Sequence, residues 1–173
     1  MGPLIPLAKY LEIEQSTAQY FTGGISILIV INYIYKLFPI IEDIDRKSFG
    51  TFFYCFSLLI LISLFWEKDP FALTAGFFIM TFGDGLAGLI GKNFKSKSWE
   101  FLNQRKSIIG TTTMFLTSLL VLTILGYRNN IDFNYYYFGI ALVATLLEQI
   151  SIIGIDNFLV PIITSTILHL AIT

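Results

Sequence analysis

The chain has 173 residues, of which 55% are hydrophobic and only 13% are charged, and its formal net charge is −1. Soluble domains carry about 25% charged residues, so this composition excludes an ordinary soluble domain and indicates an integral membrane protein. No nucleic-acid-binding signature is present, and the single cysteine, Cys55, excludes an internal disulfide and a thiolate metal cluster.

Six apolar segments follow one another along the chain, after an N-terminal apolar stretch that is too short to cross a bilayer. A transmembrane helix needs about 20 mostly apolar residues, and the second and last segments are short by that measure. The segments are expected at 20–41, 49–66, 70–91, 108–127, 135–154 and 158–172. The sequence therefore predicts an all-α fold, a polytopic transmembrane helix bundle of about six spans that forms a single domain over residues 1–173, with no soluble domain.

Lysine and arginine are concentrated in two loops that a six-span bundle places on the same face. Loop 42–48 contains Arg46 and Lys47, and loop 92–107 contains Lys92, Lys95, Lys97, Arg105 and Lys106. Basic loops favour the cytoplasmic side of a membrane. We therefore expect this face to be cytoplasmic. At the other face, Tyr135, Tyr136 and Tyr137 are typical of an interfacial aromatic belt.

An acidic residue interrupts the third apolar segment, where Asp84 lies between Gly83 and Gly85. A charge at membrane depth costs roughly 2.5–3.5 kcal/mol on insertion scales, so this carboxylate indicates a functional site. Gly88 and Gly91 follow at i+4 and i+7 and are expected on the same helix face as Asp84. Small residues on that face allow close approach of a ligand, or simply of another helix.

A second group of acidic and polar residues follows near the same expected face. Glu148 lies in an apolar helix at a depth similar to that of Asp84, and Asp156 and Asn157 begin the last segment. Carboxylates below a basic loop can hold a divalent cation beside a phosphate. The alternatives are a protonated Glu148 that makes an interhelical hydrogen bond, and a helix cap at Asp156 or Asn157.

The basic loop ends in the sequence RKSIIGT, residues 105–111, which places two cations, two hydroxyls and a glycine at a helix start. Backbone N–H groups and the helix dipole favour an anion there. Positive-inside topology alone would also explain the cations. The earlier stretch that ends in Gly91-Lys92 is not a P-loop, because Leu86 occupies the position that requires a glycine.

Taken in order and spacing, GDGLAGLIG, RKSIIGT, the intramembrane glutamate and IDNFLVP resemble the CTP-dependent polyprenol kinase family, which includes dolichol, phytol and farnesol kinases. The segment RKSFGTFFY is similar to the phytol kinase branch, and the resemblance covers most of the chain from Phe38 onwards. It implies a kinase that transfers a phosphoryl group from CTP to an isoprenoid alcohol taken from the bilayer. It also implies Mg²⁺, a role in tocopherol and prenyl-lipid synthesis, and a bacterial (cyanobacterial-type) or plastid membrane.

The resemblance assigns roles to residues of this sequence. It implies catalytic roles for Asp84, Lys106 and Glu148, with Asp84 as a metal ligand or as the base for the alcohol proton. The implied metal ligands are Asp84, Glu148 and Asp156. The implied nucleotide-binding residues are Gly83, Gly85, Gly88, Gly91, Lys92, Arg105, Ser107, Gly110, Thr111 and Asn157.

Two departures from the family pattern keep other functions open. Relatives tend to carry a glutamate where this chain has Ile109, and they begin with a further helix and a basic motif that are not found before the opening GPLIPLA. The alternatives are a CTP-dependent lipid cytidylyltransferase, a small ion-coupled transporter with Asp84 and Glu148 as its cation site, and an inactive truncated paralogue.

Overall fold

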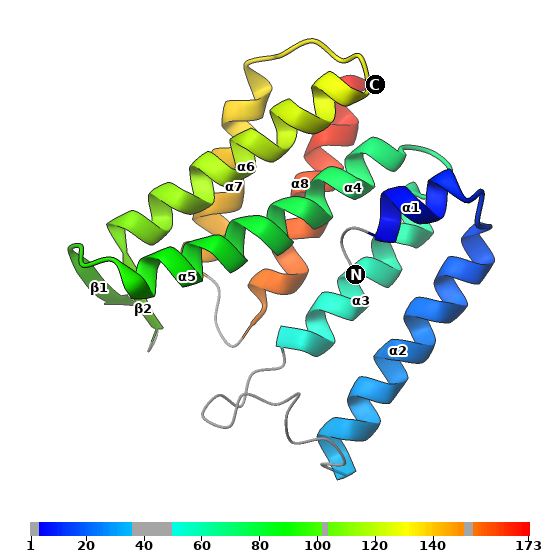
Figure 1. Cartoon of the computed structure of the whole chain (residues 1–173), viewed down its shortest axis with the longest axis horizontal. Helices are drawn as coiled ribbons and strands as arrows, with labels where there is room; N and C mark the ends of the chain where they lie inside the picture. The colour runs from blue at the N-terminus through cyan, green and yellow to red at the C-terminus, as the bar shows by residue number, and fades with distance from the viewer. Residues whose placement is uncertain (1–3, 36–49, 102–103, 151–153) are drawn as a thin grey trace.

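The computed structural model describes residues 4–35, 50–101, 104–150 and 154–173, and these residues form a mostly helical bundle (Figure 1). Loop 42–48, whose basic residues were predicted to lie on the cytoplasmic face, is outside the described residues. In chain order the elements are α1 (Leu4–Tyr10), α2 (Gln15–Tyr35), α3 (Gly50–Phe65), α4 (Pro70–Phe78), the π-helix η2 (Ile79–Asp84), α5 (Gly85–Asn93), β1 (Ser98–Phe101), β2 (Gln104–Ser107), α6 (Ile108–Arg128), α7 (Tyr136–Ile150) and α8 (Asp156–Ile172).

Helices cover the described part of every predicted apolar segment. Two continuous helical stretches, Pro70–Asn93 with 24 residues and Ile108–Arg128 with 21, are long and apolar enough to cross a membrane. At about 1.5 Å per residue they measure roughly 36 and 31 Å, against a hydrocarbon core of about 30 Å. The apolar helices α3, α7 and α8 are shorter. Length and composition thus support two candidate spans, and the six-span arrangement stays a prediction.

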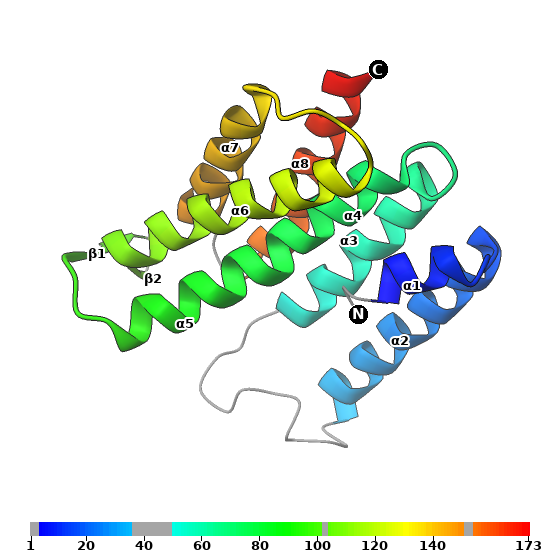
Figure 2. The same ribbon diagram turned by 45° about the horizontal axis from the view of Figure 1, so that its top comes forward.

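The basic loop between these two stretches contains a β-hairpin, which the all-α prediction did not include. Strands β1 and β2 pair antiparallel, with Trp99 opposite Lys106 and Glu100 opposite Arg105. The hairpin lies beyond the adjoining ends of α5 and α6 in both views (Figures 1 and 2). We call this the hairpin end of the bundle. Here α5 and α7 end and α6 and α8 begin.

The opposite end, which we call the far end, is closed by contacts between α4 and α8. Asp69 is the N-cap of α4, and its Oδ1 accepts a hydrogen bond from the Ala72 N–H at 2.9 Å. Its other oxygen, Oδ2, lies 2.9 Å from His169 Nδ1 near the end of α8. Along the same contact, Ser165 Oγ donates to the Ala72 carbonyl at 2.9 Å. These polar contacts fix α4 and α8 as antiparallel neighbours.

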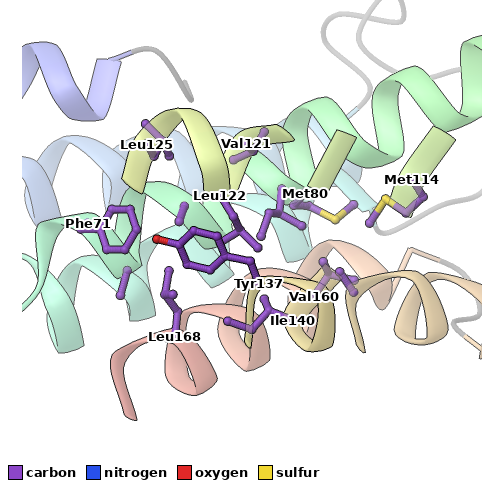
Figure 3. Close-up of a cluster of buried hydrophobic side chains, with 14 of the residues drawn as sticks. Phe71, Met80, Met114, Val121, Leu122, Leu125, Tyr137, Ile140, Val160 and Leu168 are labelled. Atoms are coloured by element: carbon purple, nitrogen blue, oxygen red, sulfur yellow. The ribbon is translucent and has the colours of Figure 1, made fainter. Parts of the chain in front are cut away.

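The hydrophobic core lies between α4, η2, α6, α7 and α8 (Figure 3). Tyr137 is at its centre, with its ring among Leu122, Ile140 and Leu168, and its side chain is fully buried. The predicted interfacial position is therefore wrong for this tyrosine, although Tyr135 is exposed. Tyr137 can be buried because Gly126 of α6, which faces it, has no side chain and leaves space for the phenol ring.

Candidate functional site

Lys106 is the best-placed functional side chain of the hairpin end. It belongs to β2, directly before Ser107, which is the N-cap of α6. Neighbouring residues of a strand point to opposite faces. Lys106 and Arg105 therefore leave the hairpin in opposite directions. Lys106 reaches α7 and keeps only 10% of its side chain exposed, whereas Arg105 is exposed and donates to Ser98 Oγ at 3.3 Å.

The ammonium group of Lys106 makes a buried ion pair with Glu148. Its Nζ donates to the carboxylate oxygen Glu148 Oε1 and, at 2.8 Å, to the backbone carbonyl of the same residue. The Glu148 side chain is only 9% exposed. That carbonyl belongs to the last turn of α7, where helix carbonyls lack an intrahelical partner. One lysine thus satisfies a buried charge and a helix end together.

Gln149 extends this contact into a network that sequence reasoning did not assign to the site. Its Nε2 donates to the second carboxylate oxygen, Glu148 Oε2, at 2.6 Å and to Thr111 Oγ1 at 2.9 Å. Both oxygens of the Glu148 carboxylate therefore have donors. The predicted site residues Lys106, Thr111 and Glu148 are joined by this network, which ties the start of α6 to the end of α7.

The N–H groups at the start of α6 already have acceptors within the chain. The Ile108 N–H donates to the Lys97 carbonyl at 3.0 Å, and the Ile109 N–H donates to Ser96 Oγ at 3.4 Å. The Gly110 N–H donates to the N-cap oxygen Ser107 Oγ at 3.1 Å. A phosphate at this helix start would have to displace these acceptors. Even with these N–H groups occupied, Lys106 and the helix dipole still attract an anion to the start of α6.

Asp84 is half-buried and is the last residue of the π-helix η2. A π-helix inside an α-helix is rare and is frequently found at functional sites. Thr81, within the same π-helix, hydrogen-bonds to the hydroxyl of Tyr54 in α3 at 2.8 Å. The wider turn ends at Asp84, and the residues that follow are α-helical, so the spacing that predicts a common face for Asp84, Gly88 and Gly91 is retained.

The glycines around Asp84 have different surroundings. A Cβ on Gly83 would lie 2.7 Å from Met114 Sδ, and one on Gly91 would lie 3.3 Å from the Gly110 Cα, so both glycines allow close packing on α6. Gly85 and Gly88 have open space around the position of a Cβ. Gly83, Gly91 and Gly110 are therefore closely packed, whereas Gly85 and Gly88 leave room beside the helix. The nucleotide-binding role of these glycines stays a prediction.

Asp84 and Glu148 both lie beside the first half of α6. The glycine before Asp84 packs against Met114 and Ser118, and the glutamine after Glu148 bonds to Thr111. Met114 is three residues from Thr111, or about 4.5 Å at a rise of about 1.5 Å per residue. The similar depth of the two acids in a bilayer stays a prediction.

Asp156 is buried and is the first residue of α8, which packs against η2. The predicted cap at Asp156 or Asn157 is wrong, because Ile155 occupies the N-cap position. The Asp156 carboxylate accepts a hydrogen bond from the N–H of Asn157 at 3.0 Å. Among the described residues, no three His, Cys, Asp or Glu side chains gather in a way that could hold a metal ion. Asp84, Glu148 and Asp156 therefore do not form a ready three-carboxylate centre. Lys92, which was predicted to bind the nucleotide, is exposed at the end of α5.

A separate apolar pocket lies at the far end, between α1, α2 and α3. Its volume is about 290 Å³, and its lining includes Ile5, Ala18, Leu58, Ile62 and Trp66. These residues belong to the starts of α1 and α2 and to the second half of α3. The pocket is therefore distinct from the charged network around Lys106.

An apolar helical bundle with buried charged groups at one end is typical of the class of membrane proteins that act on or move polar groups. Comparison with known proteins agrees. The chain is 32% identical to the phytol kinase of Synechocystis sp., over 93% of its own length and 71% of that relative. It is 27% identical to phytol kinase 1, chloroplastic, of Arabidopsis thaliana, and 29% identical to a probable chloroplastic phytol kinase of Triticum aestivum.

The chain belongs to the phytol kinase family. The alignment with the Arabidopsis relative spans 94% of this chain and 60% of the relative. The alignment with the wheat relative spans 70% of this chain and 43% of the relative. No family profile matches the chain, and no solved structure matches it.

Proposed function

We propose that this protein is a membrane-bound kinase that transfers a phosphoryl group from CTP to a long-chain isoprenoid alcohol such as phytol. The observation that carries the proposal is the buried pair of Lys106 and Glu148 at the hairpin end of a chain from this family. Phosphoryl transfer depends mainly on positioning and on neutralising the charge of the transferred group. A buried ammonium group is suited to both tasks.

Lys106 would bind a phosphate oxygen of the nucleotide. An ammonium group has three N–H donors. Two of them are used by the carbonyl and the carboxylate of Glu148, which leaves one for a ligand. The side chain is held in place on both sides, so little conformational entropy is lost when a phosphate binds. Low exposure also strengthens the electrostatic attraction, because the effective dielectric constant there is below that of water.

Glu148 and Gln149 would position Lys106. Both carboxylate oxygens of Glu148 are engaged, one by the lysine and one by the Gln149 amide. A carboxylate in this arrangement is a counter-ion first, and it would have to leave Lys106 to act as a metal ligand. We therefore propose a positioning role for Glu148 in place of the metal-ligand role that the sequence suggested.

Asp84 would accept the proton of the attacking alcohol. A general base must come within hydrogen-bonding reach of that hydroxyl, and a carboxylate is one of the usual groups. The depth of Asp84 below the hairpin suits a lipid alcohol whose hydrocarbon tail stays in the bilayer. The open space at Gly85 and Gly88, directly after Asp84, would admit the head of such a substrate.

A magnesium ion would fit the remaining carboxylates. Mg²⁺ is usually bound by one or two protein carboxylates together with substrate phosphates, so a three-carboxylate centre is not required. Asp156 is the candidate protein ligand, because it begins the helix that packs against η2. Asp84 is the alternative ligand, in which case it would not be the base. Such an ion would neutralise negative charge on the nucleotide phosphates. The site would face the cytoplasm or its plastid equivalent, and the phytyl phosphate would serve tocopherol and other prenyl-lipid synthesis.

The test is a transfer assay with the protein reconstituted in lipid bilayers. Phytol and CTP labelled at the γ-phosphate should yield labelled phytyl phosphate and CDP, and ATP, GTP and UTP should be compared as donors. Asp84→Asn should abolish turnover, and the matched change Asp132→Asn, in an exposed loop at the far end, should not. Release of pyrophosphate in place of CDP would indicate a cytidylyltransferase. Absence of any labelled lipid product would contradict the proposal.

A further inference from the structure

The hairpin joins the two helical stretches that are long and apolar enough to cross a membrane, Pro70–Asn93 and Ile108–Arg128. In both views it projects from the ends of α5 and α6 (Figures 1 and 2). If both stretches cross the bilayer, a connection of this length must lie at the boundary between lipid and water. The chemistry of its exposed side chains then decides which lipid headgroups it meets.

The exposed side chains of this connection carry an excess of positive charge. Four cations are exposed, Lys92, Lys95, Lys97 and Arg105, and the one carboxylate in residues 92–107 is that of Glu100. Within the part of the chain that the structure describes, none of the four makes an ion pair. The fifth cation of the loop, Lys106, is buried against Glu148 and does not contribute to this surface.

Large aromatic side chains lie among these cations. Phe94, Trp99 and Phe101 are 61%, 40% and 45% exposed. Trp and Tyr are enriched where a membrane protein passes through the headgroup region, because their side chains have an apolar part that faces lipid and a polar group that faces water. At the far end, Lys9 pairs with Glu67 at 3.7 Å and lies over the Trp66 ring, while Lys68 and Arg128 form no ion pair among the described residues and Tyr127 and Tyr135 are exposed. Unneutralised cations and exposed rings gather at the hairpin end.

We propose that this hairpin surface, formed by Lys92, Phe94, Lys95, Lys97, Trp99, Phe101 and Arg105, docks on anionic lipid headgroups of the bilayer. Basic residues next to a membrane attract anionic lipids, and salt screens the attraction within about a Debye length. The occupant assigned to the four exposed cations is a phosphate-bearing lipid, because Arg105 leaves the hairpin on the face opposite to Lys106. Trp99 stands opposite Lys106 in the register, so Trp99 and Phe101 lie on the Lys106 face and contact the bilayer from the other side of the hairpin. This inference does not depend on the proposed kinase activity.

Trp99 provides a local reporter for the test. The chain has two tryptophans, and Trp66 is buried with no hydrogen-bond partner for its Nε1 among the described residues, so Trp66→Phe removes no such bond. The Trp66→Phe protein is reconstituted in vesicles of zwitterionic lipid that contain a small, equal fraction of either anionic or zwitterionic lipid brominated on its acyl chains. Quenching of Trp99 then reports which lipid is enriched beside the hairpin.

Brominated anionic lipid should quench Trp99 at least threefold more than brominated zwitterionic lipid at the same fraction, and raising the salt to about 1 M should remove most of that preference. Changing the four cations to glutamine should remove the preference at low salt, whereas the matched far-end variant Lys68→Gln/Arg128→Gln should keep it. Equal quenching by both lipids at low salt would overturn the proposal. So would a Trp99 signal that responds to CTP in detergent and not to anionic lipid, which would place the hairpin in the nucleotide site.

Discussion

Gly91 and Gly110 meet where α5 crosses α6, so closely that a Cβ on Gly91 would lie 3.3 Å from the Gly110 Cα and 2.9 Å from Ser107 Oγ. The same Ser107 Oγ caps the Gly110 N–H. The crossing and the start of α6 therefore depend on one another, and a single methyl group at Gly91 would press on both.

Gly91→Ala should destabilise the protein relative to Gly88→Ala. Both changes add the same helix propensity, but a Cβ on Gly88 meets open space. The difference should be about 1–2 kcal/mol in the free energy of unfolding, the typical worth of a helix cap. Denaturant unfolding in detergent, followed by circular dichroism, measures it. Equal stabilities would mean that the crossing relaxes without disturbing the cap.

Lys106→Met should destabilise the protein more than the double change Lys106→Met/Glu148→Leu. The single change leaves a buried carboxylate without its cation, which typically costs about 3–5 kcal/mol, whereas replacing both partners by apolar residues is often close to neutral. Unfolding curves of the three proteins measure the two effects. The double variant should fold and yet fail to phosphorylate phytol. Full activity in a folded double variant would remove Lys106 from the reaction.

Thr111→Val should impair use of the nucleotide, and Thr112→Val should not. Each hydroxyl donates to the carbonyl four residues earlier, at 3.0 and 2.9 Å, but only Thr111 also accepts from Gln149. Loss of that hydrogen bond should lower kcat/KM for CTP about five- to tenfold. Gln149→Leu should have a similar effect, and the double variant should be little worse than either single one. Additive losses would contradict a shared network.

Asp69→Ala should destabilise the far end more than Asp69→Asn. Asparagine keeps an acceptor for the Ala72 N–H, so it retains the cap of α4 and weakens only the contact with His169. Asp69→Ala loses both, and the difference should be about 1 kcal/mol. Thermal unfolding measures it, with the exposed Asp132→Ala as the control. The two Asp69 variants would have the same melting temperature if the cap contributed nothing.

The helices could be predicted closely because their signals are local. The predicted start of 70–91 coincides with the cap Asp69 and the proline after it, and the predicted start of 108–127 coincides with the cap Ser107. Long apolar runs between such caps have few alternatives to a helix in a membrane. These same signals place Asp84 inside a helix, which the structure confirms, whereas Lys106 lies in strand β2 just before α6.

The contacts of the site could not be predicted because they join distant parts of the chain. Lys106 and Glu148 are 42 residues apart, and no periodicity reveals that they pair. The hairpin was missed although Ser98–Phe101 alternates polar and apolar residues, because the run is only four residues long and lies in a basic loop between apolar segments. The π-helix was missed because the composition of Ile79–Asp84 does not distinguish it from an ordinary apolar helix.

The π-helix η2 determines how the third apolar segment responds to the loss of one residue. Each turn of η2 holds more residues than an α-helical turn, so η2 accommodates an extra residue between α4 and α5. Deleting one residue from 79–83 should therefore restore an ordinary helical turn and keep the faces of α4 and α5 in place. Deleting one residue from 85–90, where the helix is regular, would rotate everything after it by about 100° relative to α4. Gly91 would then turn away from Gly110, and another face of α5 would meet α6. A one-residue deletion after Asp84 should thus be far more damaging than one within η2.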